Sequence, residues 1–380
     1  MNERIFTKDL KMKESVKLAE EHFVKLHEIP EKAFEESKTT EYIRSICAGY
    51  PVEIIDLGMK TGIIGYLDAG ASDSIALRAD IDAVPTEHGA DHLCGHDAHT
   101  ASLLGAMHYL CGIKDSLKHN IVFVFQPGEE GTRGARTLLD HGLIEKLPMK
   151  PECIFGIHNR PEANCGYIIV HKGPLMSHKS IFKINLKGKV GHGSMPHKCV
   201  DPIIAAAEII TGIQTIISRN IDPFKPAICT VSSINSGSSE SSAPETAVMT
   251  GYIRSFDEEI HRRMEERLSL LARDTAEAFE CGCDIEITNM VPAVNNSDDM
   301  YERAYRAAEL AVEEDKIIDS NPSLASEDFA VYGELIPSFF YWVGSGETGG
   351  KNAPWHDNEF KIGKAYFNTA VPLLAASAVI

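Results

Sequence analysis

The chain has 380 residues, of which 43% are hydrophobic and 24% are charged, and its formal net charge is −18. This composition is typical of a globular protein and excludes a disordered or collagen-like one. Because the length exceeds what one core usually supports, we expect a large domain and a smaller one. The negative charge argues against nucleic acids and anionic membranes as partners, since binding to either requires clustered Lys and Arg.

The sequence also indicates a compartment. Residues 1–15 lack the apolar core of a secretory signal, and no apolar run is long enough to cross a bilayer. The longest such run, 371–380, predicts a final buried element. Nine cysteines are an odd number, scattered along the chain, and form a poor disulfide framework. We therefore expect a cytoplasmic protein.

The first part of the chain alternates short apolar runs with helical patterns. Strands are predicted at residues 74–79, 120–125 and 153–157, and helices at 100–110 and 133–141. This alternation is typical of an α/β domain with a mostly parallel sheet, in which ligands bind beyond the carboxyl ends of the strands. Ligand-type side chains follow these strands, namely Asp80, Asp82, Glu129, Glu130 and His158.

Residues 178–288 have the pattern of a separate domain inserted into the first. Strands are predicted at 179–187, 227–234, 246–255 and 284–288, and helices at 201–220 and 257–280. The order β-α-β-β-α-β is that of a ferredoxin-like unit. Residues 1–177 and 289–380 then form the other domain, whose last core strand is predicted at 338–343.

Two details of the inserted domain follow from residue types. Asp201 and Pro202 are suited to the N-cap and first position of the 201–220 helix. The second helix is expected to stop near Gly282. Its apolar face is predicted to consist of Ile260, Met264, Leu268, Leu271 and Phe279.

The segment 92–99, which reads HLCGHDAH, combines imidazole, thiol and carboxylate groups at the start of a predicted helix. Cys thiolate and His nitrogen are ligands of zinc and related transition metals. The alternative is a buried Cys94 with surface histidines and Asp97 as a helix N-cap.

The segment 126–131, QPGEEG, follows an apolar strand and carries adjacent glutamates. Adjacent glutamates are common on solvated faces, but here at least one carboxylate should face the crevice. One of them can bind metal while the other holds an attacking water. His158 and His356 add imidazoles, each expected just past a core strand, although a lone His is more often structural.

These motifs together resemble the M20 metallopeptidase family, in its branch of aminoacylase- and hippurate-hydrolase-like amidohydrolases. The resemblance spans nearly the whole chain. It rests on RADIDAVP (78–85), HLCGHDAHT (92–100), QPGEE (126–130), GIH (156–158), GHGSMPH (191–197), DP (201–202), SEDF (326–329) and WH (355–356).

The resemblance implies a hydrolase for the amide bond of N-acyl amino acids. It implies two divalent metal ions, Zn, Mn, Ni or Co, in a catalytic domain of residues 1–177 and 289–380. The implied ligands are Cys94, His96, Glu130, His158 and His356. Glu129 matches the general base, and Asp82 matches the acidic residue that orients a metal ligand.

The resemblance also assigns the inserted domain to a lid and to formation of a homodimer. His192 is similar to the residue that steadies the oxyanion, typically in the partner subunit's site, and Arg254 to one that holds the substrate carboxylate. The alternatives are an exposed loop His and an Arg paired with an acidic neighbour. The chain departs from the family where an Asn-x-x-Pro is usual, because Ser241 replaces the Asn.

Three other functions remain open at this point. A metallo-dipeptidase would use the same site on a peptide with a free amino terminus. A cysteine hydrolase would use Cys94 and a nearby His, leaving Glu130, His158 and His356 without a role. A non-enzymatic binding module would catalyse no reaction, although the chain contains the full set of metal-ligand residues.

Overall fold

The computed structural model describes residues 9–131, 133–350 and 352–380. Residues 1–8, on which part of the expectation about a secretory signal rests, lie outside these. The chain forms two compact units. The first contains the described residues up to Leu175 together with Asn295–Pro322 and Asp328–Ile380, and the second contains Met176–Val294 and Ser323–Glu327. Among the described helices, none is long and apolar enough to cross a membrane.

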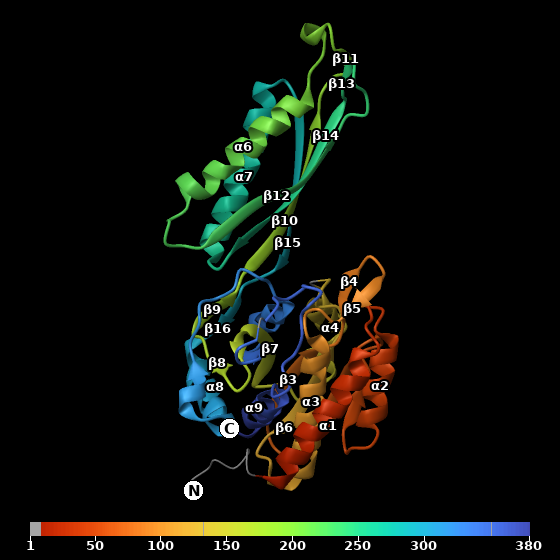
Figure 1. Ribbon diagram of the computed structural model, residues 1–380, viewed down its shortest axis with the longest axis vertical. Helices are drawn as coiled ribbons and strands as arrows, with labels where there is room; N and C mark the ends of the chain where they lie inside the picture. The colour runs from red at the N-terminus through yellow and green to blue at the C-terminus, as the bar shows by residue number, and fades with distance from the viewer. Residues whose placement is uncertain (1–8, 132, 351) are drawn as a thin grey trace. The chain divides into compact units, whose positions relative to one another are not determined.

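An eight-stranded sheet forms the centre of the first unit (Figure 1). Its middle strands are β6 (Asn120–Gln126), β3 (Ser74–Asp80), β7 (Cys153–Asn164) and β18 (Ser338–Gly346), which run parallel in this order. Every residue of β3, β6 and β18 is buried, as expected for a parallel sheet covered on both faces. The prediction of a mostly parallel sheet is confirmed.

Shorter strands extend both sides of this sheet. On one side, β2 (Ile63–Leu67) pairs antiparallel with β6, and β1 (Glu53–Ile55) pairs antiparallel with β2. On the other side, β8 (Ile168–Ile169) pairs antiparallel with β18, and β17 (Ile317–Ile318) pairs parallel with β8. Two-stranded pairings join β4 (Val84–Thr86) to β5 (Gly89–Asp91), and β9 (Gly173–Met176) to β16 (Val294–Asn296).

The longer helices of the first unit pack on one another and on the sheet. Helix α3 (His96–Gly112) contacts α1 (Leu10–His27) and α9 (Phe367–Val379), and α9 contacts α8 (Asp298–Ala311). Nearly all of α3 and α9 is buried, so the predicted buried element at the C-terminus is α9. The remaining helices are α2 (Ser37–Cys47), α4 (Gly134–Asp140) and α5 (Leu143–Lys146).

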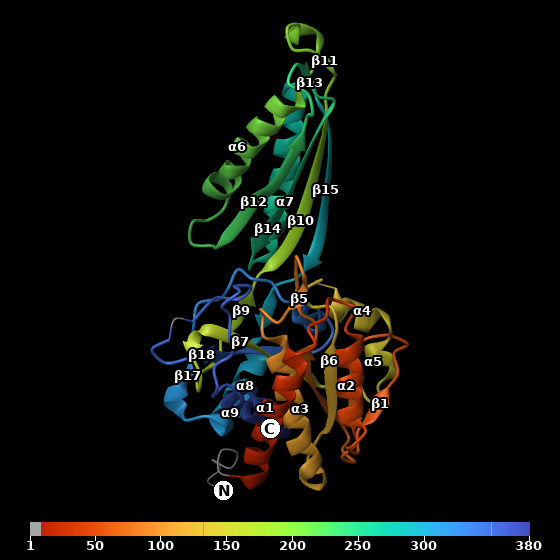
Figure 2. The ribbon, with the colours of Figure 1, turned by 45° about the vertical axis from the view of Figure 1, so that its right-hand side comes forward.

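The second unit has six main elements in the order β-α-β-β-α-β. They are β10 (His178–Lys187), α6 (Pro202–Asn220), β12 (Ala227–Ser236), β14 (Thr246–Ser255), α7 (Glu258–Ala278) and β15 (Gly282–Val291). The strands form an antiparallel sheet in the order β12-β14-β10-β15. Helices α6 and α7 lie side by side on one face of this sheet (Figure 2). A separate short pairing joins β11 (Gly191–His192) and β13 (Ser242–Ala243).

Residue types account for the start of both helices, but the end of α7 differs from the prediction. The carboxylates of Asp201 and Asp257 accept hydrogen bonds from the first amides of α6 and α7. Helix α7 ends at Ala278, and Glu280 takes the left-handed conformation (φ 58°) that we expected of a glycine. Gly282 instead opens β15, and the Phe279 side chain is exposed and not part of the buried face.

Candidate metal centre and active site

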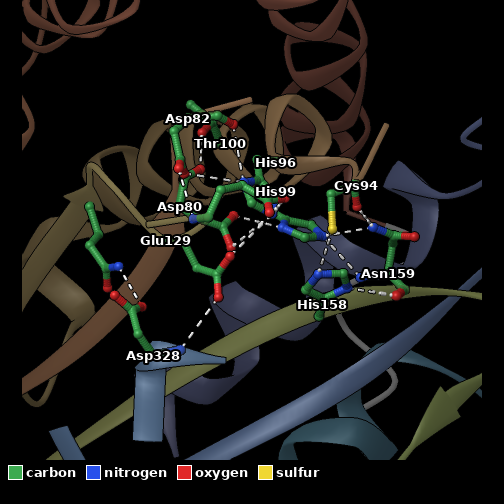
Figure 3. A network of polar contacts seen from close by, with 12 residues as sticks. Asp80, Asp82, Cys94, His96, His99, Thr100, Glu129, His158, Asn159 and Asp328 are labelled. Atoms are coloured by element: carbon green, nitrogen blue, oxygen red, sulfur yellow. Dashed lines mark hydrogen bonds and ion pairs between the residues drawn. The ribbon is translucent and has the colours of Figure 1, made fainter. Parts of the chain in front are cut away.

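The first unit brings together all five side chains predicted to bind metal. Figure 3 shows three of them, Cys94, His96 and His158, close to one another. The ligand atoms of Cys94, His96 and His158 lie within 4.8 Å of one another, as do those of Cys94, Glu130 and His356. Sγ of Cys94 lies 3.5 Å from Nε2 of His158. Oε1 of Glu130 lies 3.5 Å from Nε2 of His356 and 3.9 Å from Nε2 of His96.

The start of α3 positions two of these ligands. Gly95 is the N-cap of α3 with φ 91°, and a Cβ at this position would lie 2.4 Å from Nδ2 of Asn159. Only glycine therefore allows the chain to turn between Cys94 and His96 while Asn159 donates a hydrogen bond to the carbonyl of Cys94. The glycine at position 95 thus has a steric reason that the sequence analysis did not give.

The positions of two ligands along the chain differ from the prediction. His158 lies within β7 and not past its end, because β7 continues to Asn164. His356 follows β18 by ten residues and is held elsewhere, since its backbone N–H donates to the carbonyl of Leu93 at 2.8 Å. Its φ of 67° is uncommon for a residue with a side chain, and such strain often accompanies functional sites.

The ligand atoms fit divalent metal ions. Nε2 of His96 and Oε1 of Glu130 are buried and have no hydrogen-bond partner among the described residues. Buried polar atoms rarely lack partners unless another group satisfies them. Burial also raises the pKa of the Cys94 thiol, so a neighbouring cation is needed to favour its thiolate. Imidazole, thiolate and carboxylate together are suited to zinc and related transition metals.

Asp82 contacts two of the proposed ligands. Its Oδ1 lies 3.3 Å from Nδ1 of His96, and its Oδ2 accepts the backbone N–H of Glu130 at 2.9 Å. The carbonyl of Asp82 also lies 3.1 Å from Nδ1 of His96. A proton on Nδ1 directs Nε2 of this ring toward the other ligands, which is the common arrangement for a histidine that binds metal.

His158 is held in a neutral form. Its Nδ1 donates to the carbonyl of Asn159 at 2.8 Å, which leaves Nε2 facing Cys94. Burial, and then the neighbouring His99, hold the pKa of His158 well below its usual value. A neutral imidazole is the form that binds metal.

The carboxylate of Glu129 lies near the proposed ligands, but its contacts differ from those of Glu130. Its Oε2 is 4.0 Å from Nε2 of His96, and its Oε1 accepts the backbone N–H of Asp328 at 3.4 Å. The residue is only 6% exposed, so the carboxylate faces the interior of the unit. The two adjacent glutamates are thus both directed inward.

A buried network of hydrogen bonds lies next to the proposed ligands, and the sequence analysis did not predict it. The Arg78 guanidinium donates to Asp80 at 2.9 Å, to Asp328 at 3.0 Å and to Gln126 at 2.9 Å, and Arg78, Asp80 and Asp328 are fully buried. His99 contacts Asp80 at 2.7 Å through Nδ1. Burial opposes ionisation of Asp80, but His96, His99 and Arg78 together hold its pKa well below the usual value.

The sequence contained signals for this network. Asp80 and Arg78 belong to the RADID segment, and Asp328 belongs to SEDF. His99 lies three residues after His96 on the first turn of α3, which places both on the same side of the helix. Their mutual contacts could not be derived, because Arg78 and Asp328 are 250 residues apart.

The second unit contains two of the predicted site residues, His192 and Arg254. His192 is exposed, and its Nδ1 lies 2.8 Å from Oγ of Ser194. The carbonyl of Ser241, where the family usually has Asn, accepts the N–H of Gly193 at 2.8 Å. Arg254 donates to the carbonyl of Leu324 at 2.6 Å and lies over the Tyr252 ring, 5.4 Å from its centroid.

The alternative for Arg254 is an ion pair with an acidic neighbour such as Asp257 or Glu258. Asp257 instead caps α7, and its Oδ2 lies 3.7 Å from Nζ of Lys225. The contacts of Arg254 therefore run to a carbonyl and an aromatic ring.

Comparison with known proteins identifies the family. The profile of Peptidase family M20/M25/M40 matches residues 76–377. The chain belongs to this family. It is 36% identical over 366 residues to the N-acetyl-L-cysteine deacetylase of Bacillus subtilis, covering 93% of this chain and 85% of that one. It is 30% identical over 377 residues to the IAA-amino acid hydrolase ILR1-like 2 of Arabidopsis thaliana, covering 93% and 83%.

A solved structure of an M20 member supports the same assignment. The chain matches a Bacillus subtilis protein described as a dinuclear metal binding peptidase from the M20 family, with a TM-score of 0.82 and 31% identity. The match covers 97% of this chain and 98% of that one. The predicted resemblance to the M20 family is confirmed.

Proposed function

We propose that this M20 protein hydrolyses the amide bond of N-acyl amino acids with the help of divalent metal ions. The observation that carries the proposal is the convergence of five ligand-type side chains, two of which have buried atoms without hydrogen-bond partners. The names of the relatives support the substrate class, since one is a deacetylase of an N-acetyl amino acid and another a hydrolase of an amino acid conjugate.

The proposed mechanism assigns a separate task to each group. The two ions would be held by Cys94, His96, Glu130, His158 and His356, a set of ligands that suits Zn, Mn, Ni and Co. The chemistry that such ions supply is polarisation of the amide carbonyl and a lowered pKa of the attacking water. Glu129 accepts the proton of the attacking water and delivers it to the leaving amine. Asp82 holds His96 and Glu130 in place through the contacts described above.

The experiment is a panel of N-acyl amino acids and dipeptides, assayed after reconstitution with Mn, Zn, Co or Ni. We expect N-acyl amino acids to be hydrolysed faster than dipeptides, and a chelator to abolish activity. Preference for dipeptides would favour the metallo-dipeptidase. Activity that resists chelation but is lost on thiol alkylation would favour a cysteine hydrolase, and binding without turnover would favour a binding module.

The second unit has a proposed role of its own. Its order of elements agrees with a ferredoxin-like fold, and we propose that residues 178–288 act as a lid and dimerisation domain. In a homodimer, His192 would steady the oxyanion in the partner's site. Mixing an inactive Glu129 variant with an inactive His192 variant should then restore partial activity after subunit exchange. No recovery despite demonstrated exchange would contradict this role.

We also propose a cytoplasmic location. All nine cysteines are free thiols in the structure, including the buried Cys47, Cys153 and Cys229. Free thiols persist in a reducing compartment. Fractionation of cells that produce the full chain would test the proposal.

A further inference from the structure

A buried carboxylate outside the proposed metal site contacts the loop that carries Glu129. Glu36 is the last residue of the segment 29–36, which lies between α1 and α2, and it is fully buried. Its Oε1 accepts the backbone N–H of Phe34 at 2.9 Å and the backbone N–H of Gly128 at 2.8 Å. Gly128 is the residue immediately before Glu129.

The loop is therefore held on both sides of Glu129. The N–H of Gly128 is bound by Glu36, and the N–H of Glu130 is bound by Oδ2 of Asp82 at 2.9 Å. A buried amide N–H that lost its acceptor would be costly to leave unsatisfied, so each carboxyl oxygen fixes the amide that it binds. Two carboxylates thus fix the backbone around Glu129, and each acts on a different amide.

The segment 29–36 also packs against this loop through an aromatic side chain. The Phe34 ring lies against Gly128, where a Cβ would be 2.6 Å from a ring carbon. Gly128 has φ 73° and Phe34 has φ 63°, both in the left-handed region. Phe34 holds this uncommon conformation while its own N–H is bound by Glu36.

The same segment reaches the loop that carries Asp82. The carbonyl of Glu31 accepts the N–H of Ala83 at 2.8 Å. The carboxylate of Glu31 accepts the N–H of Thr39 at 2.9 Å, which ties the segment to the first turn of α2. One segment thus holds both loops that present carboxylates to the ligands.

We propose that Glu36 is a positioning residue for Glu129. Its carboxylate fixes the amide of Gly128, so that the Glu129 side chain leaves the backbone in the orientation needed to accept a proton from water. The inference rests on the proposed role of Glu129 as general base. Glu130 depends less on Glu36, because Asp82 holds its amide independently.

The test compares Glu36→Ala, Glu36→Gln and a matched control, Glu35→Ala, whose side chain is exposed. We expect Glu36→Ala to lower kcat by about 10- to 100-fold, because small displacements of catalytic groups can cost that much. KM should change little. Glu36→Gln should retain most of kcat, since its amide oxygen can accept both N–H groups, and Glu35→Ala should match the wild type.

A second readout does not depend on activity. The affinity for Zn²⁺, measured by competition with a chromophoric chelator, should be nearly unchanged in Glu36→Ala because Glu130 remains held by Asp82. A loss of Zn²⁺ affinity as large as the loss of kcat would overturn the inference. If Glu36→Ala does not fold, Glu36→Asp, whose shorter side chain cannot reach the Gly128 amide, takes its place.

A double-mutant cycle separates positioning from general damage. In the background of Glu129→Gln, the change Glu36→Ala should cause no further loss of kcat. An equal loss in both backgrounds, or full activity of Glu36→Ala, would overturn the inference. Full activity of Glu129→Gln alone would instead contradict the proposed function, and it is measured without any change at Glu36.

Discussion

Each unit of the protein contains a group of histidines packed among polar side chains, and the two groups differ in how their polar atoms are satisfied. In the second unit, the two ring nitrogens of His261 contact Oγ of Ser180 at 2.7 Å and Oγ of Ser255 at 3.0 Å. Its ring stacks on His178 with centroids 3.6 Å apart. In the first unit, Nε2 of His96 has no hydrogen-bond partner among the described residues.

The difference separates a structural cluster from a functional one. Burial, and then the neighbouring His178, lower the pKa of His261 to about 3, so this ring is neutral and fully hydrogen-bonded. Such a group stabilises the fold and needs no ligand. Around His96, several carboxylates and an unpartnered nitrogen converge, an arrangement that folding alone does not favour. Unsatisfied atoms are therefore better evidence of a site than histidines themselves.

The largest effect is expected at the adjacent glutamates of the first unit. Glu129→Gln should lower kcat by about 10²–10⁴-fold, the usual contribution of general-base catalysis, while the protein keeps its metal. Glu130→Gln should lose metal, because the neutral amide of Gln binds a divalent cation more weakly than a carboxylate does. Elemental analysis and steady-state kinetics measure both effects. Equal metal loss in the two variants would show that the roles are wrongly divided.

The next effect concerns Glu36, a buried carboxyl group of the first unit. Burial raises the pKa of Glu36 from 4.5 to about 7, and Asp82 acts in the same direction. The folded state therefore binds this proton more tightly than the unfolded state, and stability falls as pH rises from 4.5 to about 7. The loss is at most roughly 3 kcal/mol, at 1.36 kcal/mol per pKa unit.

Glu36→Gln cannot titrate and should lack this part of the pH dependence. Denaturant unfolding of chelated protein at several pH values measures the difference between the variant and the wild type. Glu35→Gln, at the exposed neighbouring position, is the control and should follow the wild type. A difference between Glu36→Gln and wild type that does not vary with pH would contradict the prediction.

A smaller effect is expected from the closed cluster of the second unit. His261→Ala leaves Ser180 and Ser255 without a ring partner, which should lower the free energy of unfolding by about 1–3 kcal/mol. Activity per folded molecule and metal content should not change. Loss of metal in this variant would break the distinction between the two clusters.

The smallest effect is expected at Arg254, which belongs to neither cluster. Arg254→Lys keeps the charge but loses the planar fork, so KM should rise by about tenfold, equivalent to about 1.4 kcal/mol of a charge-assisted contact. Substrates with an amidated or esterified carboxylate should be poor for the same reason. Unchanged kcat/KM for a carboxamide substrate would show that Arg254 does not recognise the carboxylate.

Local sequence patterns were sufficient to predict the parallel strands and to select five ligand-type side chains that the structure brings together. Apolar runs such as 120–125 become buried strands because both faces of a parallel sheet are covered. The HLCGHDAH and QPGEE segments place their side chains together because consecutive parallel strands end at the same edge of the sheet.

Features that depend on distant contacts were not predictable. Glu36 lies in the acidic sequence FEES, which is typical of a solvated surface, yet it is buried and accepts the N–H of Gly128, which is 92 residues away. The end of α7 was missed for a local reason: the N–H of Cys281 bonds to the carbonyl of Ala276, and the left-handed residue is Glu280, two residues before Gly282. No periodicity or spacing encodes either contact.

The pairing of β7 with β18 has a consequence for the order in which the chain folds. These strands are neighbours in the middle of the first unit's sheet, yet the main part of the second unit, Met176–Val294, is synthesised between them. We expect the second unit to finish folding while β7 still has an unpaired edge, because domains fold as they leave the ribosome. Closing so long a loop is slow, and an open strand edge promotes association between chains. Newly made or refolding protein should therefore depend on chaperones, or on low concentration, until residues 338–346 arrive to cover that edge.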